Sequence, residues 1–148
     1  MVTLKVNSLA KSYASEQVFR DLSFQFSSGV IGIAGHNGSG KSTLLRCISG
    51  LTLPSSGTVE WNVDDSEYSN KTVSRALGYA APYVQLYEEL TAIENLKFIR
   101  DLRSSQPCEP VSVVVHTYGI SGFADSLFGE LSSGQQQRVK LAASVIHR

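Results

Sequence analysis

One short segment constrains this chain more than any other. Residues 35–42 read Gly-His-Asn-Gly-Ser-Gly-Lys-Ser and fit the pattern G-x-x-x-x-G-K-S/T. Glycines let the backbone curve tightly enough for successive N–H groups to point into one concavity. Where such a loop opens onto a helix, the unpaired N–H groups and the helix dipole favour an anion. Lys41 would contact the β- and γ-phosphates of a nucleotide, and the Ser42 hydroxyl would coordinate Mg²⁺. The segment therefore predicts a loop that holds a nucleotide.

The residues on either side of this loop have the patterns that it requires. Residues 30–34 form a continuous apolar run, which is typical of a strand buried on both faces in a parallel sheet. Residues 42–49 predict a helix that ends at Gly50, because glycine commonly follows the last helical residue. The alternative is a chance glycine-rich turn before a helix, which has an expected frequency of about 0.5% in a chain of this length.

Periodicity predicts the remaining strands. Alternating apolar and polar residues predict half-buried strands at 4–6 and 22–26, and short apolar runs predict strands at 58–61 and 77–81. The polar segment 62–70 is predicted to be a loop.

The second half of the chain is predicted to be mainly helical. Thr91 and Glu94 form a capping-box pattern at the start of a helix with one apolar stripe. Residues 111–115 leave strand and helix open, because β-branched residues favour a strand whereas Gly119 is placed as a helix stop. Residues 134–148 predict a final helix. This order of elements indicates an α/β fold.

Composition argues against several classes of protein. The chain has 148 residues, the size of one domain, and with 42% apolar and 18% charged residues it is too apolar for a disordered segment. The 13 basic and 13 acidic residues cancel, so we expect no nucleic-acid partner. Cys47 and Cys108 match no disulfide or zinc spacing, and no apolar run is long enough for a signal peptide or a membrane span. We therefore expect a cytoplasmic protein.

A second motif adds to the phosphate loop. Residues 131–135 read Leu-Ser-Ser-Gly-Gln and resemble the LSGGQ signature of ABC ATPases, with Ser133 in place of the first glycine. Residues 90–96 resemble the ELT–ENL stretch that opens the helical subdomain of that family, and Tyr13 resembles the aromatic residue of its A-loop. The motifs occur in the family's order along the whole chain. The sequence is therefore identified as similar to the ATP-binding domain of ABC transporters.

The resemblance implies an architecture. It is an α/β P-loop NTPase fold of ABC type, with an antiparallel β subdomain, a partial parallel core sheet and a helical subdomain that carries the signature motif. Residues 1–81 would form the nucleotide-binding core, 82–130 the helical subdomain, and 131–148 the signature motif and its helix. Together they would make up the N-terminal part of one ABC ATPase domain.

The resemblance also implies roles for individual residues. Tyr13 would stack on the adenine of ATP, and the signature residues would contact the γ-phosphate held by a second ABC ATPase domain. Without the resemblance, Tyr13 could be an ordinary strand-end tyrosine and Ser132 an ordinary helix cap. The expected ATP-binding residues are Tyr13, Gly35, His36, Asn37, Gly38, Ser39, Gly40, Lys41, Ser42 and Thr43, with Ser42 as a Mg²⁺ ligand. The expected signature residues, acting in trans, are Leu131, Ser132, Ser133, Gly134 and Gln135.

One position departs from the family's pattern. The family has a glutamine after the strand that precedes the helical subdomain, in a pattern like GYVPQ, and Pro82 stands at that position here. A proline side chain can neither ligate Mg²⁺ nor position a water molecule. Gln85, three positions later, is the candidate substitute at the metal, and the alternative is a solvated loop residue.

A second departure concerns catalysis. In the family a strand with an aspartate and a catalytic glutamate follows the signature helix, and a switch histidine comes later. The 148 residues contain no match to these, and His36, His116 and His147 fit no switch position. We therefore expect a fragment of a longer domain, with weak ATP binding and negligible hydrolysis. The strand that is not present would pair with residues 30–34 and 77–81.

The resemblance favours one class of function over another. The leading interpretation is the ATP-driving subunit of a membrane transporter, which a transmembrane partner holds at the inner face of the cell membrane. Tyr83, Val84, Leu86 and Tyr87 are a candidate docking cluster, with packing inside the helical subdomain as the alternative. A haem- or lipid-exporter type is one subclass. A soluble ABC ATPase of the repair, translation or iron–sulfur assembly type is the competing class, and the neutral charge counts against the repair type.

Overall fold

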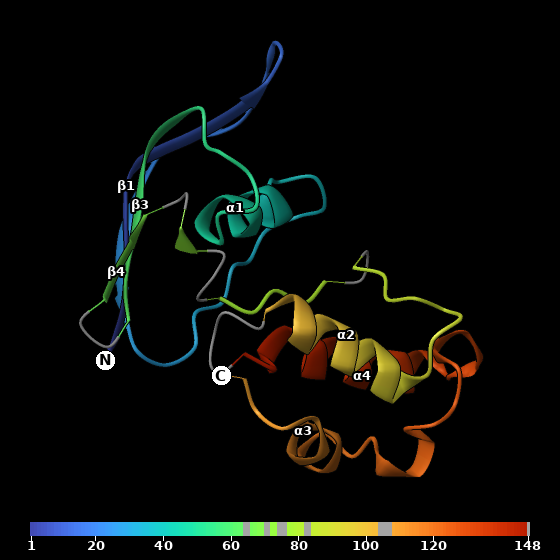
Figure 1. The fold of residues 1–148 in the computed structure, drawn as a ribbon. Coiled ribbons are helices and arrows are strands. Elements are labelled where there is room, and N and C mark those ends of the chain that lie inside the picture. The colour runs from blue at the N-terminus through green and yellow to red at the C-terminus, as the bar shows by residue number, and fades with distance from the viewer. Residues whose placement is uncertain (64–65, 70–71, 74–76, 82–83, 104–107, 148) are drawn as a thin grey trace. The chain divides into compact units, whose positions relative to one another are not determined.

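The computed structural model describes residues 1–63, 66–69, 72–73, 77–81, 84–103 and 108–147. The chain divides into two compact units, Met1–Leu77 and Gly78–Arg148. Among the described residues, the first unit contains an antiparallel sheet and one α-helix, and the second is helical (Figure 1). Each unit has a hydrophobic core of its own.

Four antiparallel strands form the sheet of the first unit, in the order β2-β1-β3-β4. Their bounds are Val2–Tyr13 (β1), Glu16–Ser27 (β2), Ser56–Val63 (β3) and Ser66–Ser69 (β4). The strands predicted at 4–6, 22–26 and 58–61 are confirmed. The loop predicted at 62–70 is wrong in part, because β3 continues to Val63 and β4 follows it. β4 is a short edge strand, where polar side chains can remain in water.

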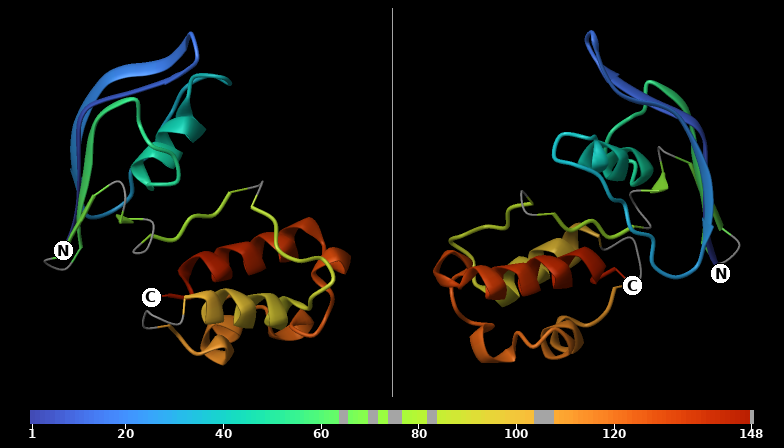
Figure 2. Two further views of the ribbon diagram at one scale, coloured as in Figure 1. Left: turned by 45° about the horizontal axis from the view of Figure 1, so that its top comes forward. Right: turned by 180° about the vertical axis from the view of Figure 1, so that it is seen from behind.

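Helix α1, Lys41–Ile48, packs against one face of this sheet (Figure 2). Apolar residues of β1, β3 and the last turn of α1 form their common core. The fully buried members are Leu4, Val6, Leu9, Cys47, Ile48 and Val59. Burial raises the pKa of the Cys47 thiol, so this cysteine acts as a small apolar residue of the core.

The C-terminal end of α1 is bonded to the sheet. The indole N–H of Trp61 on β3 donates to the carbonyl oxygen of Ile48 at 2.7 Å, and so pairs one of the carbonyls that a helix end leaves open. Gly50 follows in the left-handed conformation, with φ of 73°. The helix predicted at 42–49 and its stop at Gly50 are confirmed.

The strand predicted at residues 30–34 does not form. This segment and residues 77–81 have no regular secondary structure, and Val30 is 97% exposed. A strand buried on both faces is stable only where neighbouring strands take its backbone hydrogen bonds, and no described residue forms a ladder with residues 30–34. The α/β class holds, but within the described ranges the sheet is antiparallel and the expected parallel part is not seen.

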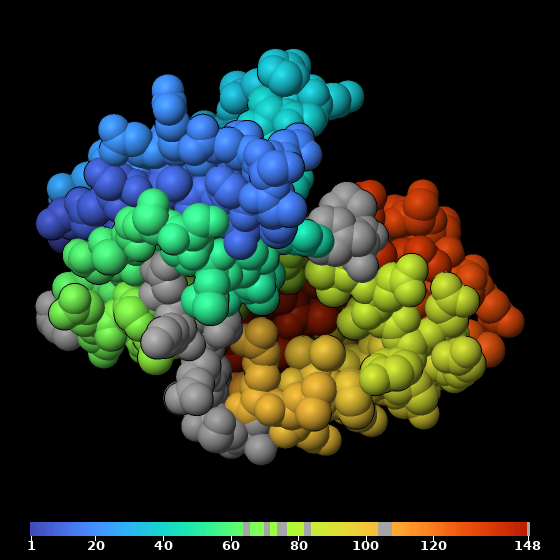
Figure 3. Space-filling view, turned by 90° about the horizontal axis from the view of Figure 1, so that it is seen from above, coloured from blue at the N-terminus to red at the C-terminus, as the bar shows by residue number. Residues whose placement is uncertain are grey.

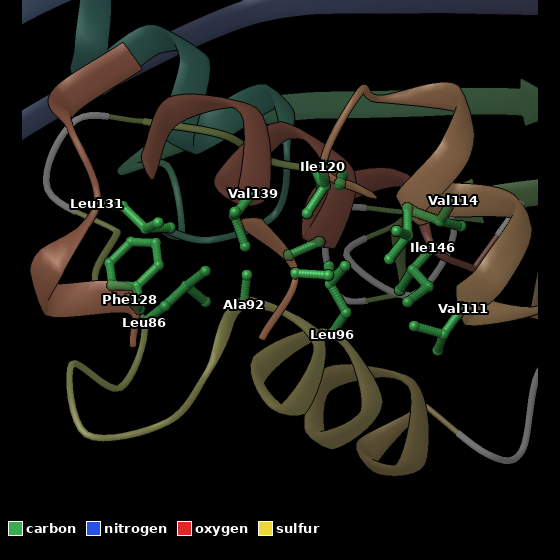
Figure 4. Close-up of a cluster of buried hydrophobic side chains, with 14 residues drawn as sticks. Leu86, Ala92, Leu96, Val111, Val114, Ile120, Phe128, Leu131, Val139 and Ile146 are labelled. Carbon is green, nitrogen blue, oxygen red and sulfur yellow. The ribbon is translucent and has the colours of Figure 1, made fainter. Parts of the chain in front are cut away.

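In the part of the second unit that the structure describes, there are three α-helices and two short 3₁₀ turns. They are α2 (Ala92–Leu102), α3 (Val111–Thr117), η2 (Ser121–Phe123), η3 (Phe128–Glu130) and α4 (Ser133–Val145). Figure 4 shows Leu96 of α2, Val114 of α3 and Val139 of α4 in one core. The choice left open at 111–115 is resolved as a helix, because Val111, Val114 and Val115 are buried in that core at helical spacing. Among the helices of the described ranges, none has the length and apolar character needed to cross a membrane.

A buried asparagine organises the segment before α2. The side-chain oxygen of Asn95, which is fully buried, accepts a hydrogen bond from the Tyr87 N–H at 2.9 Å. Its amide donates to the carbonyl oxygens of Tyr87 at 2.9 Å and Thr91 at 3.1 Å. Thr91 and Glu94 then form the predicted capping box. Hydrogen bonds from Thr91 lower the pKa of the Glu94 carboxyl, so the ionised group is the one that caps the helix.

We expect Asn95→Leu to lower the free energy of unfolding by about 3 kcal/mol, because the Tyr87 N–H and several carbonyls would lose their buried partner. Chemical denaturation of the two proteins measures this difference. Lys97→Leu, an exposed site on the same helix, is the control and should change the value by less than about 0.5 kcal/mol. Equal stability of Asn95→Leu and the wild type would contradict this account of the segment.

Candidate nucleotide-binding site

The phosphate loop turns sharply before it enters α1. Gly38 and Gly40 have φ of 83° and 87°, in the left-handed region that favours glycine. The Ser39 N–H donates to the His36 carbonyl oxygen at 3.2 Å and closes a turn within the loop. The Leu44 N–H donates to the Gly40 carbonyl oxygen at 2.8 Å and begins the helix. The loop therefore ends at a helix N-terminus, where N–H groups point toward an incoming anion.

Gly40 is also a point of close approach between the loop and the sheet. A Cβ atom at this position would lie 2.6 Å from Cγ1 of Val18 on β2. The pattern of the motif predicts a glycine here, and the structure adds a second reason for it. The start of α1 is set by its contact with β2 as well as by its backbone conformation.

Lys41 lies over the loop that precedes it. Its ammonium donates to the carbonyl oxygens of Gly35 at 2.8 Å and His36 at 2.7 Å. The charge is thus held at the loop and is partly exposed. An oxygen of a phosphate group would compete with these carbonyl oxygens for the same donor, and it is the stronger partner because it is an anion whereas the carbonyl oxygens are neutral.

The other predicted residues of the loop are at its surface. His36, Asn37 and Ser42 are exposed, and Nδ1 of His36 lies 2.8 Å from the Asn37 carbonyl oxygen. In the space-filling view the loop, in cyan, forms part of the surface of the first unit (Figure 3). Ser42 and Thr43 lie in the first turn of α1. The described ranges contain no group of three His, Cys, Asp or Glu residues that could hold a metal ion.

Tyr13 is the last residue of β1, next to the turn that joins β1 to β2. Its side chain is 48% exposed. The ammonium of Lys11 lies over the ring, 4.7 Å from its centroid, and also donates to the carbonyl oxygen of Leu53 at 2.8 Å. Neither contact of Lys11 was predicted. The sequence could have indicated the contact with the ring only through the spacing, because residues two positions apart on a strand lie on the same face.

The signature residues lie in the second unit, at the start of α4. Ser132 is the N-cap, and with Gln135 it forms a capping box in which Ser132 N–H donates to Gln135 Oε1 at 2.9 Å. Leu131 is buried in the helical core, whereas Ser133 and Gly134 are exposed in the first turn. The helix predicted from residue 134 begins one residue earlier. Leu131 therefore anchors the segment, and the residues after it reach solvent.

The segment before α2 holds the remaining predicted residues. Gln85 is exposed, and Pro82 and Tyr83 lie outside the described residues. Leu86 belongs to the helical core, whereas Tyr87 is exposed and packs edge-on against Phe98 of α2, with ring centroids 5.2 Å apart. Within the candidate docking cluster, core packing therefore applies to Leu86, and Tyr87 is at the surface. The buried Asn95 that holds this segment was not singled out from the sequence.

Solved structures identify the class of this fold. An ATP-binding cassette of an ABC transporter superposes with a TM-score of 0.76 at 23% identity and covers 99% of this chain and 66% of the other. A cassette in a dimeric post-hydrolysis state, bound to ADP and Pi, gives a TM-score of 0.73 at 22% identity over 97% of this chain and 69% of the other. The fold is that of an ATP-binding cassette.

The sequence comparisons then give the family. The sequence profile of the ABC transporter family matches residues 19–148, and the chain belongs to that family. It is 38% identical to the cytochrome c biogenesis ATP-binding export protein CcmA of Mannheimia succiniciproducens over 141 residues, which cover 94% of this chain and 66% of that protein. CcmA of Photobacterium profundum is 37% identical, with 94% and 70% covered. The sulfate/thiosulfate import ATP-binding protein CysA of Thermosynechococcus vestitus is 30% identical, with 96% and 43% covered. The chain thus spans about two thirds of the length of these CcmA proteins.

We expect Gly40→Ala to destabilise the first unit by about 1–2 kcal/mol, because alanine is strained at a φ of 87° and its Cβ would meet Val18. Chemical denaturation followed by the fluorescence of Trp61 measures this change. A double-mutant cycle with Val18→Ala separates the two causes, since the second substitution removes the contact but not the strain. Gly32→Ala, where a Cβ would meet nothing within 4 Å, is the matched control. Equal stability of Gly40→Ala and Gly32→Ala would refute the explanation.

Proposed function

We propose that this chain binds ATP as the nucleotide-binding part of an ABC transporter subunit. The observation that carries the proposal is the loop at 35–42, which turns onto the N-terminus of α1 with the Lys41 ammonium held over it. N–H groups of the loop and of the first turn of α1 would bind the phosphates. The proposed ATP-binding residues are Tyr13, Gly35, His36, Asn37, Gly38, Ser39, Gly40, Lys41, Ser42 and Thr43.

Mg²⁺ fits this arrangement as a companion of the nucleotide. Magnesium in nucleotide sites keeps several waters and is held by one or two protein groups together with phosphate oxygens, so a cluster of carboxylates is not required. Ser42 in the first turn of α1 supplies a hydroxyl at the surface. Gln85 is the candidate second contact in this proposal. Bound Mg²⁺ would offset the negative charge of the phosphates.

The second unit would act on the nucleotide of a partner domain. Leu131, Ser132, Ser133, Gly134 and Gln135 lead into the N-terminus of α4, which is a second place where N–H groups and the helix dipole favour an anion. We propose that two ABC ATPase domains associate through ATP, each with its signature segment on the γ-phosphate of the other. The cassette solved with ADP and Pi is described as dimeric, which supports this proposal for a relative.

The relatives favour a transporter over a soluble ABC ATPase. The CcmA proteins are named ATP-binding export proteins of cytochrome c biogenesis. We therefore propose a cytoplasmic protein held at the inner face of the membrane by a transmembrane subunit, with the exporter type as the subclass. The proposed division of labour is a nucleotide-binding core at 1–81, a helical subdomain at 82–130 and the signature helix at 131–148. Co-purification with a membrane protein, rather than with ribosomes or DNA, would distinguish the two classes.

We expect Lys41→Ala to weaken the binding of Mg·ATP by about 10- to 100-fold, which corresponds to the loss of a hydrogen bond between charged groups. Titration calorimetry on the 148-residue chain measures the dissociation constant. Lys5→Ala removes an exposed lysine of β1 and is the control for net charge, so its affinity should equal that of the wild type. A Lys41→Ala protein that binds as tightly as the Lys5→Ala protein would overturn the proposed site.

We expect the 148-residue chain to bind ATP without hydrolysing it at a measurable rate. Their sequence has no match to the family's catalytic glutamate or the aspartate before it, so no side chain is assigned to polarise the attacking water. We expect phosphate release from ATP to be no faster than that of Lys41→Ala in a steady-state assay. Turnover that is clearly faster than this control would mean that other residues perform the chemistry.

A further inference from the structure

Lys11 lies beside Tyr13, the residue on which adenine is proposed to stack, and it has no role in the proposed function. The ammonium of Lys11 lies over the ring of Tyr13, 4.7 Å from its centroid. The same ammonium donates to the carbonyl oxygen of Leu53 at 2.8 Å, so the lysine is held at a second point. The tyrosine itself remains 48% exposed. Lys11 thus contacts the ring of a tyrosine that is about half exposed to solvent.

The second contact of Lys11 connects this ring to α1. Leu53 lies in the segment that follows α1, and further hydrogen bonds attach that segment to the end of β1. Ser55 N–H donates to the Ala10 carbonyl oxygen at 2.8 Å, and Ser12 N–H donates to Ser55 Oγ at 3.0 Å. An α-helix of 8 residues is about 12 Å long. Tyr13 is therefore linked to the phosphate loop in three steps. Lys11 contacts the Tyr13 ring and the segment after α1, and α1 begins at the end of the phosphate loop.

We propose that Lys11 is a positioning residue for the base, and that it holds the Tyr13 ring in the orientation in which adenine stacks on it. The inference rests on the proposed function, in which Tyr13 is the adenine platform. A ring oriented before binding loses less conformational entropy when the base arrives. The ammonium is attracted to one electron-rich face of the ring, which leaves the other face for a second aromatic system.

This role predicts a difference between ligands that contain a base and ligands that do not. Tripolyphosphate has the phosphate chain of ATP without the adenosine, so its binding depends on the phosphate loop and not on Tyr13. A lysine that acted only through its charge would instead affect both ligands, because long-range attraction does not depend on the base. Comparison of the two ligands therefore separates positioning from general electrostatics.

The experiment is calorimetric titration of the 148-residue chain with Mg·ATP and with Mg·tripolyphosphate. Lys11→Met keeps an unbranched side chain one atom shorter and removes the charge. We expect it to weaken the binding of Mg·ATP by about three- to tenfold and to leave the binding of Mg·tripolyphosphate unchanged. Lys11→Arg keeps a cation that can lie on the ring and donate to a carbonyl, so it should retain most of the affinity for Mg·ATP. Lys5→Met, at an exposed lysine of the same strand, should match the wild type with both ligands.

Four results would overturn the inference. Equal losses for both ligands in Lys11→Met would indicate a general effect of charge, and no loss for either would remove the role altogether. If Tyr13→Ala binds Mg·ATP as tightly as the wild type, Tyr13 contributes nothing to affinity, and the inference fails together with the adenine role of Tyr13. If the wild type binds neither, the proposed phosphate site fails first. Thermal unfolding of each variant shows whether the fold is retained.

Discussion

The attachment of α1 to the sheet is the constraint on which the candidate site depends. At its N-cap the helix lies close to β2, since a Cβ on Gly40 would be 2.6 Å from Cγ1 of Val18. At its last turn Trp61 of β3 donates to the Ile48 carbonyl oxygen. Cys47 and Ile48, both in this last turn, have side chains buried against the sheet. The phosphate loop is therefore shaped by a helix that the sheet holds at both ends.

In the second unit, the N-terminus of α4 is also held by contacts with neighbouring residues, here within the helical core and not on a sheet. Leu131 is buried in the helical core, and the side-chain amide of Gln136 donates to the Phe128 carbonyl oxygen at 3.0 Å. These contacts fix the backbone just before and after the Ser132 cap. In both units, buried residues thus hold in place a helix whose N-terminus reaches solvent. They are Cys47 and Ile48 in the first unit and Leu131 in the second. A site that binds an anion through backbone N–H groups needs such support, because these N–H groups must stay in fixed positions and still be accessible to the anion.

Local features could be predicted from the sequence, and features that depend on distant partners could not. The loop at 35–42, the stop at Gly50 and the Thr91–Glu94 capping box are set by residues within a few positions of one another, and their expected local structure is present. The strand expected at 30–34 needed backbone partners elsewhere in the chain, so its apolar run was not sufficient. Residues 111–115 had both propensities, and only the core decided between them.

The contacts of Lys11 and Asn95 illustrate the same limit at the level of single side chains. Each residue is ordinary in the sequence and gains its importance from carbonyl oxygens that the fold brings to it. Asn95 lies within the segment that resembles the family, but that resemblance says nothing about what its amide bonds to. For the candidate site, the sequence predicted that the loop at 35–42 leads into a helix. The direction in which the Lys41 ammonium points required the structure.

The bond between Trp61 and α1 also makes the two units distinguishable in solution. The chain has one tryptophan, and it lies where β3 meets α1, so its emission reports the packing of the first unit directly. Far-ultraviolet circular dichroism instead comes mainly from α2, α3 and α4 of the second unit. One denaturation experiment read by both signals would therefore follow each unit by its own spectrum. Coincident curves would describe a single cooperative structure, and separated curves two structures that unfold independently.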